Sequence, residues 1–171
     1  MLAVAQLNSD DPAETGSFNG LPAPPLETLI GYQLRRANGR MMADFAATLA
    51  PLEVRPVLFG TMSLIHARPG IIQTSLGSEL GIQRANLVPL VNELAGRGLI
   101  ERRPAPGDRR AAALHLTPVG ESLFRQAASL VQAHEERMLG QLSASERTEL
   151  IALLRKVSSE KDEQQTERKR R

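Results

Sequence analysis

Gln83, Arg84, Ala85 and Asn86 open a segment with helical periodicity, and three of the four carry side chains that can read DNA bases. An arginine can pair with guanine through two hydrogen bonds, and an asparagine or a glutamine can pair with adenine in the same way. A helix N-terminus also favours a phosphate group. We expect Arg84 and Asn86 to contribute most. The alternative is that one of these side chains caps the helix or contacts only a backbone phosphate.

Residues suited to contacts with the DNA backbone lie on either side of this segment: Thr74, Ser75, Arg102, Arg103, Arg109 and Arg110. The hydroxyls of Thr74 and Ser75 fit phosphate contacts at the start of a preceding helix, although one of them could instead cap that helix. Arg109 and Arg110 follow a turn and are candidates to enter or straddle a minor groove, where narrow A·T segments concentrate negative potential. Arg102 and Arg103 are weaker candidates for phosphate contacts, because residues of a strand alternate between two faces.

The charge of this part of the chain agrees with a polyanionic partner. Residues 84–110 contain six arginines and three acidic residues, a net charge of +3, whereas the whole chain has a net charge of only +2. A local basic surplus is typical of a protein that binds duplex DNA, although a solvated basic face is the alternative. Aromatic residues make up 3% of the chain, which argues against the stacking platforms that bind single-stranded nucleic acids.

Several other classes of site are not expected. The chain has no cysteine, which excludes disulfides, thiolate zinc sites and a thiol redox switch. The spacing of His66, His115 and His134 matches no metal motif, and there is no nucleophile elbow, phosphate loop or paired-carboxylate signature. We therefore expect neither an enzyme nor a cofactor. No apolar run approaches the roughly 20 residues that span a bilayer, and the N-terminus lacks a basic signal region, so we expect a cytoplasmic protein without a membrane partner.

Hydrophobic periodicity and stop signals predict the elements that would position these residues. The predicted helices cover residues 26–49, 55–66, 73–80, 83–97 and 118–142, followed by a last helix that begins at a capping box, Ser143-x-x-Glu146. Two short strands, 99–103 and 111–116, flank a Pro- and Gly-rich turn. Pro89 falls inside the helix at 83–97, so we expect a bent or tightened opening turn there.

The predicted organisation is one domain with two tails. Residues 1–25 are predicted to be a mobile arm, 26–157 the domain, and 158–171 a charged, frayed tail. Within the domain, long helices at about 26–50 and 118–157 flank a central part at about 55–116. The fold class is mainly α with a small β-hairpin wing. A helix-turn-helix followed by a hairpin is the winged helix-turn-helix arrangement, in which the second helix enters the major groove and the hairpin reaches an adjacent groove or the backbone.

Residues 77–103, 106–110 and 114–120 resemble the helix-turn-helix, the wing and the following helix start of the MarR family of transcription regulators. The wing motif Asp-x-Arg is present as Asp108-Arg109-Arg110, and the likeness runs from about residue 31 to residue 157. The resemblance implies that Asp108 orients an arginine of the wing. It also implies a homodimer, with the terminal helices interlocked, that binds a near-palindromic double-stranded operator. The half-site centres are then expected about 34–36 Å apart.

Many members of the family bind a small molecule between the dimer helices and the DNA-binding lobe. By resemblance, that region would be lined by Tyr32, Arg35, Arg36, Asn38, Arg40, Phe59, Met62 and His66. The stretch 31–38 also resembles a subgroup that senses aromatic acyl-CoA thioesters such as hydroxycinnamoyl-CoA. We therefore expect a repressor released by an anionic aromatic or acyl-CoA effector. The alternatives are that these arginines are solvated or pair with acids, and that the protein is a dimeric winged-helix interaction module without DNA binding.

Overall fold

The computed structural model describes the backbone of residues 17–18, 21–22, 24–105 and 108–169, and the side chains of residues 24–105 and 112–158. The chain forms two compact units, Met1–Arg40 and Met41–Arg171. Most of the arm predicted for residues 1–25 lies outside the described residues, so that prediction stays untested.

The first unit contains a short hairpin and the beginning of a long helix. Strands β1 (Ser17–Phe18) and β2 (Leu21–Pro22) pair antiparallel. A 3₁₀ turn, η1 (Leu26–Thr28), follows and precedes α1 (Ile30–Leu49), which continues into the second unit. The predicted helix from residue 26 is therefore corrected at its start. The reason is local, because the backbone N–H and the hydroxyl of Thr28 both bond to the carbonyl of Pro25 and close a tighter turn.

In the second unit, three helices match the predicted spans to within one or two residues. They are α2 (Pro56–Ala67), α3 (Gln73–Leu80) and α4 (Arg84–Gly96). Gly81 ends α3 in the left-handed conformation, with φ of 64°, and its N–H reaches the carbonyls of the last turn. A glycine adopts this conformation without steric cost, which is why the sequence marks the boundary well.

The wing belongs to a three-stranded antiparallel sheet in the order β3-β5-β4, with β3 (Ile71–Ile72), β4 (Ile100–Ala105) and β5 (Asp108–Leu116). Both predicted strands are longer than expected, and β3 was not predicted. Its two residues pair with Leu114 and Ala113, which anchors the segment before α3 to the base of the hairpin. The register shifts between Pro104 and Ala105, next to the turn.

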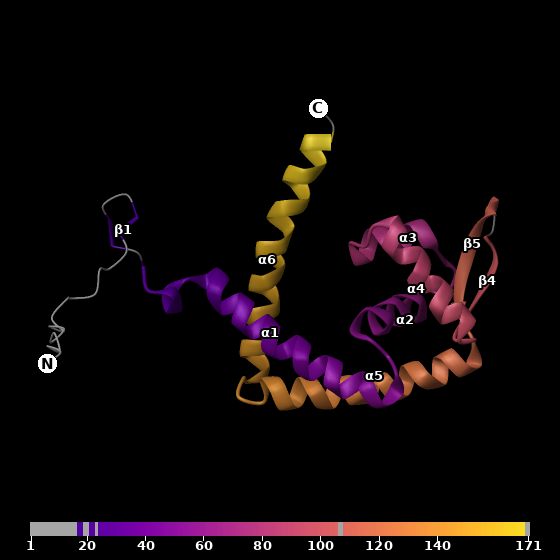
Figure 1. The fold of residues 1–171 in the computed structure, drawn as a ribbon, viewed down its shortest axis with the longest axis horizontal. Coiled ribbons are helices and arrows are strands. Elements are labelled where there is room, and N and C mark those ends of the chain that lie inside the picture. Colours follow the sequence, from indigo (N-terminus) through magenta and orange to yellow (C-terminus); the bar gives the residue numbers. More distant parts are fainter. Residues whose placement is uncertain (1–16, 19–20, 23, 106–107, 170–171) are drawn as a thin grey trace, which may run out of the picture. The chain divides into compact units, whose positions relative to one another are not determined.

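One hydrophobic core holds α2, α3, α4 and the sheet together, and α5 (Pro118–Leu139) adds Ala127 to it. Figure 1 shows α5 running beneath α2 toward the base of the β4–β5 hairpin. The largest buried side chains include Leu58, Ile65, Leu87 and Leu114, each no more than 2% exposed. Full burial of such a side chain stabilises the fold by about 1.5–3 kcal/mol. The core therefore fixes α4 and the hairpin relative to each other.

The last helix, α6 (Ala144–Lys169), begins at the predicted capping box. The backbone N–H of Ser143 donates to Glu146 at 2.8 Å, and the N–H of Glu146 donates to the Ser143 hydroxyl at 3.3 Å. The backbone stays helical to Lys169, which corrects the frayed tail expected from residue 158. That segment contains no glycine or proline and is rich in glutamate, glutamine, lysine and arginine, all good helix formers.

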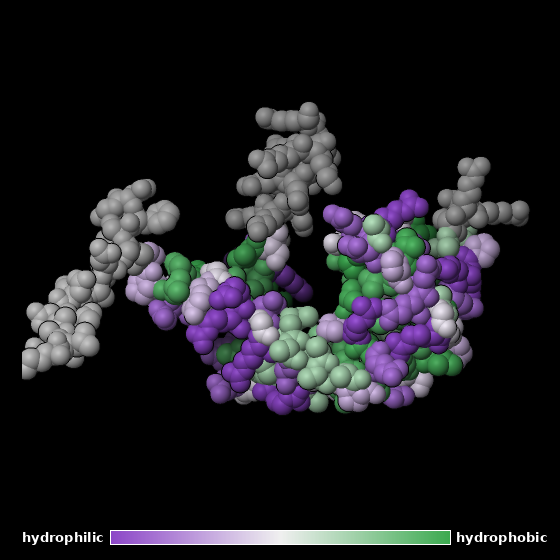
Figure 2. Space-filling model, in the orientation of Figure 1, coloured by the Kyte–Doolittle hydropathy of each residue, from purple (hydrophilic) through white to green (hydrophobic). Residues whose placement is uncertain are grey.

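Apolar side chains remain uncovered on α6 and, separately, at the start of α1. On α6, Leu150, Leu153, Leu154 and Val157 are 37–58% exposed. In the first unit, the exposed apolar residues are Leu26, Leu29, Ile30 and Leu34. Hydrophobic residues are visible on the surface of both segments in Figure 2. Large exposed apolar patches mark interaction surfaces. Among the described residues, no helix combines the length and hydropathy needed to cross a bilayer.

Candidate nucleic-acid interface and effector-binding residues

The first turn of α4 presents the four predicted base-reading residues to solvent. Gln83 occupies the N-cap position, but its side chain makes no capping hydrogen bond. Arg84, Ala85 and Asn86 are the first three helical residues, and all four are exposed. No hydrogen bond or ion pair with the described side chains engages Arg84 or Asn86. The capping alternative is therefore wrong for these residues, and their donors and acceptors are available to a ligand.

Thr74 and Ser75 lie in the first turn of α3. The N-cap residue is Ile72, so the alternative that either hydroxyl caps this helix is wrong. Thr74 is exposed and Ser75 is half-buried. Thr74 and Arg84 line one open pocket of about 400 Å³, which also includes residues of β3 and β5. The structure thus brings a hydroxyl candidate and a base-reading candidate to one surface.

The C-terminal half of α4 is tied to its neighbours by side chains. Glu93 pairs with Arg55, at the start of α2. Just beyond the end of α4, Arg97 donates to the carbonyl of Glu53 at 2.8 Å. The helix is continuous through Pro89, and the bend expected there stays a prediction. Because proline has no N–H, the hydrogen bond to the carbonyl of residue 85 is missing.

The wing arginines are described only in part. Arg109 and Arg110 lie near the start of β5, which begins three residues before the predicted strand at 111–116, and their side chains are outside the described residues. Arg103 is exposed on β4 and pairs with Glu101 of the same strand. Arg102, one residue earlier, donates instead to Asn92 of α4 at 2.5 Å. The two adjacent arginines therefore have different partners, as expected for a strand whose side chains alternate.

The first-unit residues assigned to the effector form an exposed basic cluster on α1. The guanidinium groups of Arg35 and Arg36 each lie 5.7 Å from the centroid of the Tyr32 ring, within the range of a cation–π contact. Asn38 and Arg40 are also exposed. Within the described side chains, Arg35, Arg36 and Arg40 have no carboxylate partner, which disfavours the alternative that they pair with acids. A solvated cluster remains the other reading.

The effector residues assigned to α2 fall into two environments. Phe59 and His66 belong to a row of aromatic rings. The ring centroids of Phe59 and Phe124 of α5 are 5.7 Å apart, and those of Phe124 and His66 are 4.5 Å apart. His66 also bonds to Glu121 of α5 at 2.9 Å. Met62, in contrast, is 1% exposed inside the core, so a ligand could reach it only if the core repacked. Phe124 and Glu121 were not singled out in the sequence.

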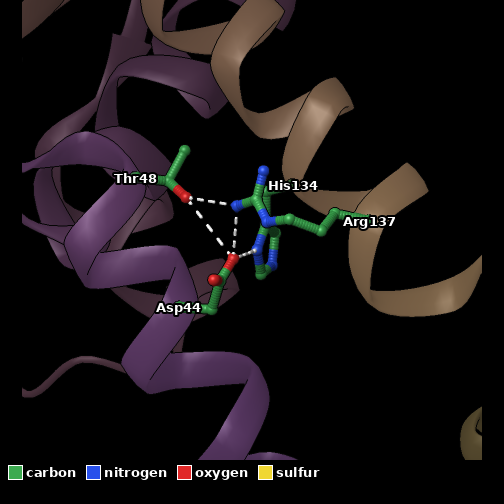
Figure 3. Close-up of polar contacts among 4 residues, drawn as sticks. All are labelled: Asp44, Thr48, His134 and Arg137. Carbon is green, nitrogen blue, oxygen red and sulfur yellow. Dashed lines mark hydrogen bonds and ion pairs between the residues drawn. The ribbon is translucent and has the colours of Figure 1, made fainter.

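A polar cluster joins α1 to α5 within the second unit (Figure 3). His134 is 2% exposed, and its Nδ1 lies 2.6 Å from Oδ2 of Asp44. Arg137 donates to the same carboxylate oxygen at 2.5 Å and to the Thr48 hydroxyl at 2.9 Å. The ring of His134 also packs against Phe45 at 5.3 Å. His134 is therefore buried by its own chain, and no partner subunit is needed to cover it.

This cluster predicts a stability change at acidic pH. The hydrogen bonds from Arg137 and His134 hold the pKa of Asp44 below its ordinary value of 3.8. A carboxyl group with a lowered pKa stabilises the fold above its ordinary pKa, and that contribution is lost as the pH falls through the folded pKa. We expect the melting temperature of the wild type to fall more steeply below about pH 4 than that of Asp44→Asn. If the melting temperatures of the wild type and of Asp44→Asn fall in parallel from pH 7 to pH 2.5, the Asp44 carboxylate does not contribute to the stability of the fold.

Comparisons with known proteins agree with this geometry. The family model described as MarR family matches residues 56–112. A putative transcriptional regulatory protein for the hcr operon of Thauera aromatica is 34% identical over 129 residues, which is 75% of this chain and 78% of the relative. Both are consistent with the winged arrangement of α3, α4 and the β4–β5 hairpin.

Two solved structures of the transcriptional repressor CouR are also similar. CouR bound to a 23-mer DNA duplex is 37% identical, with a TM-score of 0.74, and the match covers 78% of this chain and 94% of that chain. CouR bound to p-coumaroyl-CoA is 35% identical, with a TM-score of 0.69 and the same coverage. With identity above one third over three quarters of its length, and with the wing and reading helix in place, this chain belongs to the MarR family.

Proposed function

We propose that this protein is a dimeric, sequence-specific DNA-binding repressor that a small molecule releases from its operator. The observation that carries the proposal is the first turn of α4, where Arg84 and Asn86 are exposed and unengaged by other described side chains. The relatives support it, because they are a putative operon regulator and a repressor bound to a DNA duplex. An exposed arginine and asparagine at a helix start match the donor and acceptor pattern of the major groove.

Other residues would supply affinity and register rather than base choice. Thr74 and Ser75 lie at the start of α3, on the same lobe as α4, and suit phosphate contacts. Arg103, Arg109 and Arg110 of the hairpin would neutralise further phosphates and approach the minor groove. In a symmetric dimer the two reading helices address half-sites about 34–36 Å apart, so the operator is expected to be near-palindromic.

The central DNA-binding prediction concerns Arg84. Replacing it with alanine is expected to weaken operator binding by about 1–3 kcal/mol and to relax the preference at one base position, because a bidentate pair with guanine would be lost. The measurement is fluorescence anisotropy with a duplex selected by the wild type from a random-sequence pool, and with its single-base variants. Arg125→Ala, an exposed arginine of α5, is the charge-matched control.

Two outcomes would count against this assignment. An equal loss on the selected duplex and on random DNA would make Arg84 a phosphate contact only. Failure of the wild type to select any duplex would favour the interaction module without DNA binding.

We further propose an aromatic acyl-CoA thioester as the effector. The CouR neighbour was solved with p-coumaroyl-CoA, and this chain carries an exposed cationic cluster on α1 with a tyrosine ring beside it. Arginines suit the phosphates of coenzyme A, and an aromatic ring suits its adenine. A ligand that binds better to the DNA-incompetent form shifts the population away from DNA.

The effector test compares p-coumaroyl-CoA with free p-coumarate and with coenzyme A alone. We expect only the thioester to release the selected duplex at micromolar concentration. Its coenzyme A part supplies the anionic groups and its acyl part supplies the aromatic ring, and each separate compound lacks one of them. Arg35→Ala/Arg36→Ala should reduce the response without changing DNA affinity in the absence of ligand. Release by none of the three compounds would remove this class of effector.

A further inference from the structure

We propose that Arg102 is a positioning residue that ties the wing to the reading helix, and that it does not act as a phosphate contact. The proposal rests on the DNA-binding function proposed above and names a residue that determines how two reading elements act together. Its basis is one hydrogen bond between α4 and β4, made by two residues that lie ten positions apart in the sequence. Arg102 of β4 donates through Nη2 to Oδ1 of Asn92 of α4 at 2.5 Å.

Because of its position along the hairpin, this hydrogen bond can control the angle at which the hairpin leaves the core. Arg102 pairs in register with Leu114, a fully buried residue of β5, so the strand is firmly seated at that point. The regular register ends two to three residues later, between Pro104 and Ala105. At about 3.3 Å per residue, the end of β4 lies roughly 10 Å beyond Arg102. A small change of hairpin angle at Arg102 therefore becomes a larger displacement near the start of β5, where Arg109 and Arg110 lie.

The place of the bond along α4 is equally informative. Asn92 lies in the half of the helix opposite the base-reading turn, next to Glu93, which pairs with Arg55, the residue just before α2. Arg55, at the N-cap of α2, and Arg102, in β4, thus hold two neighbouring residues of α4 from different sides of the chain. Side-chain bonds therefore fix α4 at this end. At the other end, Arg84 and Asn86 make no hydrogen bond or ion pair with the described side chains. Arg102 would therefore set the angle between α4 and the wing.

Arg102 also differs from the adjacent Arg103 in the partner to which its guanidinium group bonds. A hydrogen bond from a guanidinium to an amide oxygen is charge-assisted and directional. Arg103 pairs with Glu101 within β4 and makes no hydrogen bond or ion pair with α4 among the described residues. Since adjacent residues of a strand point to opposite faces, the two arginines cannot serve the same surface. A contact with DNA is expected from Arg103, and a contact with the reading helix is seen for Arg102.

A double-mutant cycle on Arg102→Ala and Asn92→Ala tests the proposal. Operator affinity is measured by anisotropy on the duplex selected by the wild type, over a series of salt concentrations, with a scrambled duplex beside it. Each single variant is expected to lose about three- to ten-fold in affinity for the selected duplex, and the double variant no more than either single variant. Because no phosphate contact is removed, the slope of log affinity against log salt should stay at the wild-type value.

Three results would overturn the proposal: an Asn92→Ala variant with wild-type affinity, losses that add in the double variant, or an Arg102→Ala slope that falls by about 0.9. Arg103→Ala provides the charge-matched comparison on the same strand, and its loss should be independent of Asn92→Ala. Melting curves establish that the variants are folded. A wild type that binds no duplex would refute the proposed function itself, which is a separate outcome from loss of coupling.

Discussion

Replacing Gly120 with alanine is expected to destabilise the protein by about 3 kcal/mol or more, because the added methyl group meets backbone that cannot retreat. An ideal Cβ at Gly120 would lie 1.9 Å from the carbonyl oxygen of Leu99. That oxygen already accepts the N–H of Thr117 at 3.0 Å. Among the glycines that the structure describes, none other would bring an added Cβ this close to another atom, so the first turn of α5 lies tightly against the turn before β4.

The capping residue explains why this junction is so tight. The hydroxyl of Thr117 accepts the N–H of Gly120 at 3.0 Å and donates to the carbonyl of Gly98 at 2.6 Å. One side chain thus begins α5 and holds it against the turn that ends α4. Any shift that makes room for a Cβ at residue 120 breaks at least one of these bonds. Loss of the junction would also loosen the base of the wing, since β4 begins at Ile100.

Gly60→Ala in α2 is the matched control. Its Cβ would meet only Leu80, at 3.9 Å, an ordinary van der Waals distance. Alanine is favoured over glycine inside a helix by about 1 kcal/mol, so this variant should be slightly more stable than the wild type. Urea unfolding of both variants decides the matter. If Gly120→Ala unfolds at the wild-type urea concentration, the approach of Gly120 to Leu99 does not limit stability.

The elements that could be predicted from the sequence are those with strong local signals. The predicted bounds of α3, from Gln73 to Leu80, are those observed, because an apolar pair at i and i+4 ends at a glycine. The capping box at Ser143 was predicted for the same reason, and its two reciprocal hydrogen bonds are present. The exposed start of α4 followed from periodicity as well. In each case the signal spans fewer than about ten residues.

What escaped prediction depends on contacts between distant segments. Strand β3 contains only two residues, and it exists because Ile71 pairs with Leu114, more than 40 positions away. Similarly, the carboxylate beside His134 comes from Asp44, on a helix near the other end of the chain. The pairing of β1 with β2 was also not predicted, because each strand contains only two residues.

The candidate site shows the same division. Residue types at the start of α4 predicted which side chains could read bases, and the structure adds that none of these side chains makes a capping hydrogen bond. The different partners of Arg102 and Arg103 could not be read from two adjacent identical residues. Alternation along a strand predicts that they face opposite ways, but only the packing of α4 decides which one meets Asn92.

Replacing Leu154 with glutamate is expected to abolish the dimer and to weaken operator binding by about 100-fold or more. Leu154 is 40% exposed in a helix that has no buried residue among those described, and Leu150, Leu153 and Val157 form the same apolar face. A helix that buries nothing gains little stability from its own chain, so a second copy is needed to cover this face. A glutamate there would place a charge in an apolar interface without a partner.

The loss of DNA binding follows from the loss of the dimer. Two linked reading helices bind their half-sites as one event, whereas separate monomers bind each half-site alone and lose an effective concentration of about millimolar. Ala152→Glu is the matched control, because residue 152 lies about 200° around the helix from residue 154 and receives the same charge. Light scattering should show a monomer for Leu154→Glu and a dimer for Ala152→Glu, and anisotropy should follow the same order. If Leu154→Glu remains a dimer with full affinity, a surface other than this face of α6 joins the two subunits.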